Sequence, residues 1–540
     1  MTERLHLLAS GAAAAPAPKG EPRPWWESRP FVAAMIMIAF VPLLYPPVPP
    51  LVDLIGHMGR YRVQLDLATS PYLDQYYAFR WAPIGNLGVD LPVELLGRII
   101  GLEPAVKLIV LSIPPLTVAG LLWVAHEVHH RLPPTALFAL PFCYSFPFLF
   151  GFTNFTLAMA MALIAFGWWL RLASRGRDRL RAILFVPISI LIFFTHAFGW
   201  GTLGLLCFSA EAVRQHDRGI GWFKAGWKAA LNASVMLLPV AFMLLWQRGT
   251  SQQMTSGWFQ WKRKWEWVYS ALRDRVEWFD IGTLVVLAVV MLLAVVHRRL
   301  TLSRNLAFSA IVLIAAFVVL PWTIFGSAYA DMRIMPYIMA IALIAIRFEG
   351  DTYLPLARGL AIAGLLLFLV RIAGTTVSLA IAADNQSARL AALDHVPRGA
   401  RMVHLVSEDC ATRWALPRNS HLGAMGIVRR ETFSNDQWVT EGANLLSVHY
   451  PGAGRFIADS SQIVRPAKCA NRKELTLDQA IRAIPSGAFD YLWLIDAVPS
   501  DPRLLAGKTL VWSGPGSRLY RLSGAPKDVG LGPQQTSDHR

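Results

Sequence analysis

A carboxylate, an imidazole and a guanidinium stand close together in the segment LVDLIGHMGR, residues 51–60. If this segment is helical, Asp53, His57 and Arg60 occupy positions i, i+4 and i+7 and share one face. A carboxylate beside an imidazole can accept a proton, and an arginine can hold a phosphate. The pattern therefore predicts either a catalytic site, with Asp53 as the base, or a local ion pair.

The composition places this segment in a membrane protein. Of 540 residues, 54% are hydrophobic and only 16% are charged, and the mean hydropathy is +0.41. Long apolar runs in such a chain indicate a polytopic α-helical membrane protein. The net charge of +16 is typical of basic cytoplasmic loops, and no zinc-finger spacing or RNA-binding motif points to nucleic acid.

The distribution of basic residues predicts the orientation. The segment 86–101 carries Asp90, Glu94 and Arg98, so we expect it to lie in the interface rather than to span the membrane. With the N-terminus inside, the cytoplasmic loops then hold 15 Lys and Arg residues, and the short outer connections hold only Arg333. The eleven membrane helices are expected near residues 31–46, 105–127, 133–150, 154–173, 181–195, 197–213, 228–246, 281–297, 305–325, 334–347 and 358–382.

The chain divides into a membrane part and a C-terminal α/β part. Strand-like runs at 400–406, 489–495 and 508–513 alternate with helical patterns at 385–395 and 476–484. The predicted organisation is a disordered cytoplasmic tail (1–30), a transmembrane domain (31–383) with outer loops 47–104 and 247–280, a periplasmic α/β domain (384–523) and a polar tail (524–540).

The loop 247–280 combines tryptophans with basic residues. Trp258, Trp261 and Trp265 recur at near-helical spacing, and Lys262, Arg263 and Lys264 lie beside them. This pattern predicts an amphipathic helix at the level of the lipid headgroups. The helix either anchors the loop or brings its basic side to a lipid-linked phosphate.

This topology gathers the unusual polar residues at the outer face. Asn154 begins a helix, His196 lies in a tight turn, and Asp331 and Arg333 precede a late helix. Each also has a simpler explanation: Asn154 caps its helix, His196 hydrogen-bonds loop backbone, and Asp331 pairs with Arg333. Asp53 differs, because a carboxylate flanked by apolar residues at the membrane edge is costly without a partner or a task. Arg371, in mid-helix, is expected to meet a polar partner or line a cavity.

Two of the four cysteines lie in the C-terminal part. Cys410 and Cys469 would share one small domain in an oxidising periplasm, which predicts a disulfide. The alternative is two distant free thiols. Cys143 and Cys207 fall in apolar helices and are expected to be packing residues.

The order of these features resembles the GT-C superfamily of integral-membrane glycosyltransferases, which use polyprenyl-phosphate sugars. Asp53 opens a long first outer loop, and a Tyr- and Trp-containing stretch, YYAFRWAPIG (76–85), follows it. There is no Asp-x-Asp or Asp-Glu pair, because Leu54 follows Asp53, so the divalent metal of oligosaccharyltransferases is not implied and no cofactor is firmly implied. The absence of a Trp-Trp-Asp motif argues against asparagine-linked oligosaccharide transfer.

The resemblance implies a bacterial inner-membrane enzyme of the cell envelope. It would move a sugar from a polyprenyl-phosphate donor to a hydroxyl of a glycan, lipid or protein acceptor at the periplasmic face, with inversion. Asp53 would be the base, and Arg60 or Arg333 would stabilise the departing phosphate. The main alternative is a transporter or flippase of a lipid-linked saccharide, and a third is a scaffold for the C-terminal domain. The expected substrate-binding residues are His57, Arg60, Asn154, His196, Asp331 and Arg333.

Overall fold

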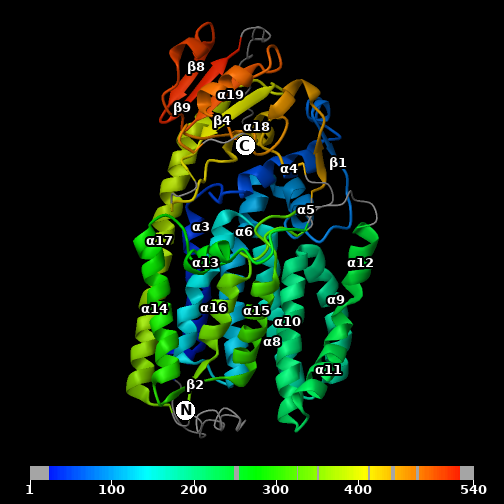
Figure 1. The fold of residues 1–540 in the computed structure, drawn as a ribbon, viewed down its shortest axis with the longest axis vertical. Helices are drawn as coiled ribbons and strands as arrows, with labels where there is room; N and C mark the ends of the chain where they lie inside the picture. Colours follow the sequence, from blue (N-terminus) through cyan, green and yellow to red (C-terminus); the bar gives the residue numbers. More distant parts are fainter. Residues whose placement is uncertain are drawn as a thin grey trace, which may run out of the picture.

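A bundle of apolar helices carries a smaller α/β unit at one end (Figure 1). The computed structural model describes residues 24–247, 255–324, 326–349, 352–410, 414–439, 444–469 and 474–522. The predicted tail at 524–540 and all but the last residues of the predicted tail at 1–30 lie outside these ranges. The described residues show the predicted fold class, an apolar helical part followed by a C-terminal α/β part.

Helical segments stand at each predicted position of the bundle. Among the described residues, α6 (Leu102–His129), α8 (Thr153–Ser174), α14 (Glu277–Val296) and α17 (Leu354–Leu390) are long and apolar enough to span a membrane, and the bent pair α11–α12 makes a fifth candidate. The count of eleven spans therefore stays a prediction. The other segments are α2 (Arg29–Ile38), α3 (Val41–Leu44), η3 (Pro134–Tyr144), α7 (Phe146–Phe150), α9 (Asp178–Thr195), α10 (Ala197–Asp217), α11 (Trp222–Ala233), α12 (Leu238–Gln247), α15 (Arg304–Val319) and α16 (Met335–Ile344).

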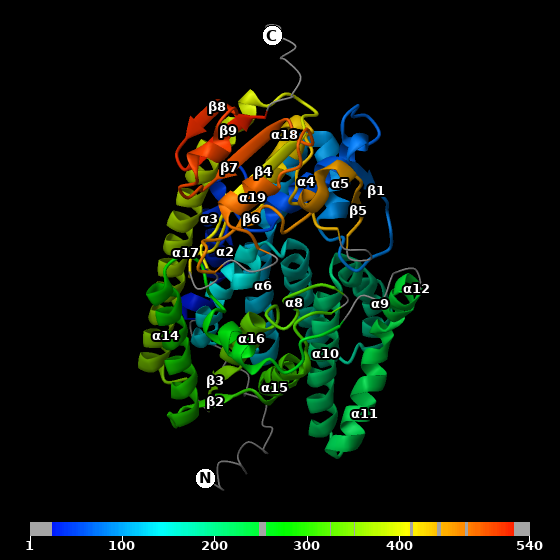
Figure 2. The same cartoon turned by 45° about the horizontal axis from the view of Figure 1, so that its top comes forward.

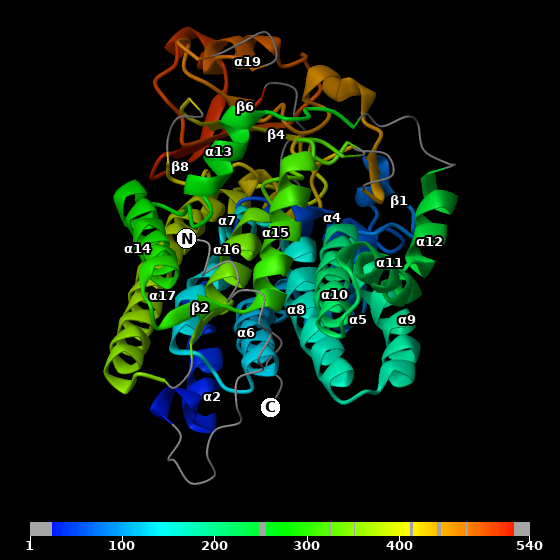
Figure 3. The same ribbon diagram turned by 60° about the horizontal axis from the view of Figure 1, so that its bottom comes forward.

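Prolines explain the broken segment at 133–150. Pro134, Pro141 and Pro147 each lack a backbone N–H, so the chain forms the 3₁₀ helix η3 and the short α7 instead of one continuous helix. Groups of helices are separated in space: α9, α10, α11 and α12 gather on one side, and α14 runs beside α17 on the other (Figure 3).

A buried ion pair joins α14 to α17. Arg371 Nη1 lies 2.6 Å from Asp280 Oδ1, and Arg371 Nη2 donates to the carbonyl of Leu272 at 3.1 Å. The expectation that Arg371 meets a polar partner in the bundle is confirmed. A buried charge without such a partner would be strongly destabilising, so the pair fixes these two helices against each other.

The segment predicted as the first outer loop folds into α4 (Leu54–Asp66), the short strand β1 (Tyr77–Phe79) and α5 (Asp90–Ile100). In α5, Leu91, Leu95 and Ile99 are half or more exposed, whereas Asp90 is fully buried. An exposed apolar stripe on a short helix is what a membrane interface accepts. The helix does not qualify as a span by length and composition, in agreement with the interfacial prediction.

The C-terminal unit is a mixed five-stranded sheet in the order β6-β4-β7-β9-β8. The strands β6, β4 and β7 are parallel, and β9 and β8 continue the sheet antiparallel. The predicted strands correspond to β4, β7 and β8, whereas β6 and β9 were not predicted. The strands are β4 (Met402–Ser407), β6 (Ile463–Val464), β7 (Tyr491–Ile495), β8 (Thr509–Gly514) and β9 (Ser517–Arg521), with helices α18 (Met425–Arg430) and α19 (Leu477–Ala483).

The C-terminal unit sits directly on the first outer loop (Figure 2). Strand β1 pairs antiparallel with β5 (Leu446–Val448), and α18 packs on α4. The predicted boundary at residue 384 falls inside α17, which continues without a break from the bundle to Leu390. The two parts of the chain are thus joined by a helix, a strand pair and a helix–helix contact.

Cys410 and Cys469 form a disulfide, with their Cα atoms 5.6 Å apart. We expect both thiols to resist alkylation in the oxidised protein and to react after reduction. Because a cross-link restricts the unfolded chain, loss of the disulfide should lower the free energy of unfolding by ~2–4 kcal/mol. Differential alkylation with mass spectrometry, and melting of the Cys410→Ser/Cys469→Ser variant, test this. Full labelling without reductant would contradict it.

Candidate active site

Backbone contacts fix Asp53 at the start of α4. Its N–H donates to the carbonyl of Phe150 at 2.9 Å, beside the end of α7. Gly151 has φ +102°, and a Cβ at that position would lie 2.6 Å from the Asp53 nitrogen. Only glycine combines this conformation with this close approach. The tight turn after α7 therefore determines where the carboxylate stands.

The Asp53 carboxyl group is largely buried and makes no hydrogen bond within the described residues. It is 14% exposed, and its nearest opposite charge is His421, whose Nε2 lies 3.8 Å from Oδ1. Burial raises the pKa of Asp53 to about 7; His421 opposes this rise, Asp459 adds to it and Arg333 opposes it. A carboxyl group with such a pKa can take and release a proton near neutral pH.

His57 lies one turn further along α4 and does not pair with Asp53. Its ring packs against Trp438 with centroids 4.8 Å apart, and its Nδ1 is buried without a hydrogen-bond partner. Burial, together with the charges of Arg60 and His421, holds the pKa of His57 well below its usual value. His57 is therefore a neutral ring at neutral pH, packed against Trp438.

Arg60 is engaged elsewhere. Its Nη2 lies 2.8 Å from Asp90 Oδ1, and its Nη1 donates to Asn444 Oδ1 at 3.0 Å. Its side chain is only 2% exposed. The ion-pair interpretation thus describes Arg60, with Asp90 instead of Asp53 as its partner. This placement joins α4 to α5 and to the C-terminal unit.

Asn154 holds the beginning of α5 in place. Its Oδ1 accepts from the Val89 N–H at 2.6 Å, and its Nδ2 donates to the carbonyl of Asn86 at 3.0 Å and to Asp90 Oδ2 at 3.1 Å. It makes no capping hydrogen bond to its own helix. The simpler explanation, that Asn154 caps its own helix, is therefore wrong, and the side chain instead links α8 to residues 86–90.

His196 caps the start of α10. Its Nδ1 accepts from the Phe198 N–H at 3.1 Å, as its simpler interpretation predicted. Its ring also packs edge-on against Phe155, with centroids 5.5 Å apart. The residue therefore shapes the wall of the site through backbone and aromatic contacts.

Asp331 and Arg333 do not pair with each other. Asp331 instead accepts from Lys264 Nζ and from Trp267 Nε1, both at 3.1 Å. Both donors are buried residues of α13 (Trp261–Tyr269). The predicted amphipathic helix is thus short, and Lys264 points inward. Trp261 and Trp265 remain exposed on its other side, where an interface would meet them.

Arg333 is a buried guanidinium without a carboxylate at salt-bridge distance in the described part of the chain. Its Nη2 donates to Ser327 Oγ at 3.1 Å, but Nε and Nη1 have no hydrogen-bond partner. Its charge lies over the rings of Phe152 and Phe198, at 4.6 and 5.1 Å. Burial lowers the pKa of Arg333 to about 10, and the charge of Asp53 opposes this. Arg333 is therefore still a cation at neutral pH, with donors free for an anion.

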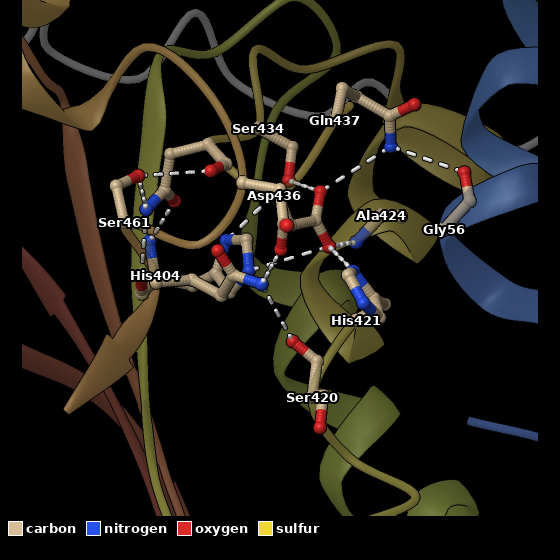
Figure 4. A network of polar contacts seen from close by, with 12 residues as sticks. Gly56, His404, Ser420, His421, Ala424, Ser434, Asp436, Gln437 and Ser461 are labelled. Atoms are coloured by element: carbon tan, nitrogen blue, oxygen red, sulfur yellow. Dashed lines mark hydrogen bonds and ion pairs between the residues drawn. The ribbon is translucent and has the colours of Figure 1, made fainter. Parts of the chain in front are cut away.

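The C-terminal unit supplies polar groups that the sequence interpretation missed. His404, His421, Asp436 and Gln437 form a buried network that reaches Gly56 of α4 (Figure 4). A run of polar residues before Trp438 was the only sequence signal, and such runs usually indicate a loop. No group of three or more His, Cys, Asp or Glu residues in the described ranges could hold a metal ion.

The raised pKa of Asp53 predicts a pH-dependent stability. The unfolded carboxyl group releases its proton near pH 4 and the folded one near pH 7, so stability should fall as the pH rises between these values. Asp53→Asn imitates the protonated form and removes this slope. The variant should therefore melt at a higher temperature than the wild type at pH 8. A lower melting temperature at pH 8 would show that the carboxylate stabilises the fold.

No protein-family model matches the chain, and no curated protein matches it. Solved structures with a similar chain path include ArnT from Cupriavidus metallidurans in the apo state (13% identity, 91% of this chain and 96% of that chain, TM-score 0.47). Others are arabinofuranosyltransferase AftD from Mycobacteria (15%, 92% and 40%, 0.46) and the same ArnT bound to undecaprenyl phosphate (12%, 92% and 98%, 0.45). At these identities and scores they are likenesses only, and the interpretation of the site rests on its own geometry.

Proposed function

We propose that this chain is a membrane glycosyltransferase. It moves a sugar from a polyprenyl-phosphate donor to an acceptor hydroxyl at the periplasmic face of a bacterial inner membrane. The observation that carries this proposal is that two buried groups influence each other electrostatically: the Asp53 carboxyl group, with a pKa of about 7, and the Arg333 guanidinium, a cation with unpartnered donors. A base and an anion-binding group at the end of an apolar bundle suit a substrate whose phosphate is attached to a lipid.

The reaction can be derived from these two groups. The acceptor oxygen attacks the anomeric carbon while its proton passes to the Asp53 carboxylate. The bond between the anomeric carbon and the phosphate oxygen breaks, and its electron pair leaves with the phosphate. Arg333 stabilises the charge that develops on this leaving group. A single displacement inverts the anomeric centre, and no general acid is required because the phosphate leaves as an anion.

Burial favours Arg333 over Arg60 as the phosphate-binding residue. The Arg60 guanidinium already contacts Asp90 and Asn444, so a phosphate would have to displace a buried ion pair. Arg333 has Nε and Nη1 without hydrogen-bond partners and, among the described residues, no carboxylate that an anion would have to displace. Arg333 also lies just before α16, at the end of one of the apolar helices.

Asp53→Asn should lower turnover by roughly 10²–10⁴, the usual contribution of a positioned general base, while leaving folding and donor binding intact. The assay uses purified protein in liposomes with a polyprenyl-phosphate sugar pool, and mass spectrometry of envelope glycans extends it to cells. Asp74→Asn, an exposed carboxylate of the same loop, is the matched control. Wild-type turnover in Asp53→Asn at equal protein level would exclude the mechanism, and saccharide flux without transfer would identify a transporter.

Arg333→Met should weaken the handling of the donor phosphate. Methionine keeps the apolar contacts with Phe152 and Phe198 but removes the cation, so we expect a loss of roughly 10²-fold in kcat/KM for the lipid-linked donor. Arg503→Met, at an arginine that is 92% exposed in the C-terminal unit, should behave as the wild type. Unchanged kcat/KM in Arg333→Met would assign the phosphate to another residue.

A further inference from the structure

The ring of His421 lies between two carboxylates that come from different parts of the chain. Its Nε2 is 3.8 Å from Asp53 Oδ1, and its Nδ1 is 4.0 Å from Asp436 Oδ2. The ring is 7% exposed, packs on Trp438 with centroids 4.4 Å apart, and has no hydrogen-bond partner at Nδ1. These distances exceed hydrogen-bond length, so the ring is held by packing and couples to both carboxylates through its charge.

Asp436 is rigidly held behind this ring (Figure 4). Its carboxylate accepts from the Ala424 N–H at 3.0 Å and from Ser434 Oγ at 2.9 Å, and it lies 3.5 Å from His404 Nε2. Burial alone would raise the pKa of Asp436, but His404, His421 and Ser434 outweigh it and hold the pKa below its usual value. Asp436 is therefore a fixed negative charge on the side of His421 that faces away from Asp53.

Glycines in α4 allow the C-terminal unit to come this close. A Cβ on Gly56 would lie 2.6 Å from the Trp438 ring and 3.2 Å from Cγ of His421. A Cβ on Gly59 would lie 2.7 Å from Gln437 Nε2, which donates to the Gly56 carbonyl at 3.2 Å. The missing side chains of Gly56 and Gly59 thus leave the space, here called the seat, in which the His421 ring packs against α4.

We propose that His421 is the positioning residue of Asp53, acting through its charge, and that Asp436 favours the charged form of the His421 ring. The membrane part thus supplies the base, Asp53, and the C-terminal unit supplies the residues that tune it, His421 and Asp436. The geometric pairing stands on the contacts above, and its part in turnover rests on the proposed transferase function.

The charges around the pair give the sign of the effect. His421 is faced by Asp459, Asp53, Asp436 and Glu408; burial disfavours its protonation, but these carboxylates outweigh burial and raise its pKa. Asp53 in turn is faced by the cations His421 and Arg333 and by the carboxylate of Asp459, and Tyr329 and His57 are the other titratable groups nearby. A protonated His421 therefore stabilises the Asp53 carboxylate and keeps it available as a base at neutral pH.

The first experiment measures the pairing without any transfer assay. Histidine rings of the purified full-length protein are ¹³C-labelled, and their titrations are followed by NMR, with His421→Gln identifying the signal among the 13 histidines. Asp53→Asn and Asp436→Asn should each lower the pKa of His421, because each removes a negative charge that faces it. His395→Gln, at an exposed histidine of the same unit, should leave this titration unchanged. An unchanged His421 titration in folded Asp53→Asn overturns the proposal.

The second experiment measures the role in turnover. The acid limb of the wild-type pH profile is expected near the Asp53 pKa of about 7. In His421→Gln it should move to higher pH, because the cation that favours the Asp53 carboxylate is gone. The ratio of turnover at pH 8.5 to that at pH 6.5 should rise on the order of fivefold, as for a shift of about one unit from an opposite charge at this distance. An equal loss at every pH would mean that His421 only packs, and would overturn its positioning role.

The two proposals fail in different ways. If the wild type transfers no sugar but the His421 titration responds to Asp53→Asn, the transferase function fails and the pairing stands. If Asp53→Asn abolishes transfer but neither titration nor profile responds to the partner residue, the function stands and the pairing fails. Gly56→Ala changes no charge; by pushing His421 from its seat it should shift the profile in the direction of His421→Gln. An unshifted Gly56→Ala profile would count against the proposed seat.

Discussion

The contact between α4 and the segment around Trp438 is the constraint on which the site depends. A helix can approach another part of the chain this closely only where it has no side chains, and Gly56 and Gly59 provide that surface. The contact buries most of the first turn of α4. Asp53 loses most of its water as a result, and this loss is the main cause of its raised pKa.

Burial at this junction forces every ionisable group to find a partner or to change its proton affinity. Arg60 solves this through Asp90, and Lys264 through Asp331, each at about hydrogen-bond distance. Such pairs satisfy charges that would otherwise be costly, and they also hold the elements in place. Asp53 and Arg333 have no partner of this kind in the described residues. Their unsatisfied state is what separates the candidate active site from the surrounding structural ion pairs.

The sequence predicted elements better than it predicted partners. Apolar runs and turn residues located the bundle and three strands of the sheet, because hydrophobic burial leaves a local pattern. The helical face shared by Asp53, His57 and Arg60 also exists, but a spacing along one helix cannot say what packs against it. The interaction partners of these side chains lie in α5 and in residues more than 350 positions away, such as His421. Short strands such as β6 and β5 were missed because two or three residues carry no periodicity.

The two parts of the chain supply different groups to the candidate site because one consists of apolar helices and the other is an α/β unit with a packed polar network. In the proposed function, the cation for a lipid-linked phosphate stands at the end of the bundle, and Arg333 lies there, just before α16. A fixed polar network such as that around Asp436 needs a rigid, close-packed surround to hold buried charges, which the C-terminal sheet offers. Asp53 begins the helix that touches both. Because His421 and Asp53 belong to different parts of the chain, a displacement of the C-terminal unit relative to the bundle would change the distance between them, and thus the proton affinity of Asp53. The unbroken α17 opposes such a displacement.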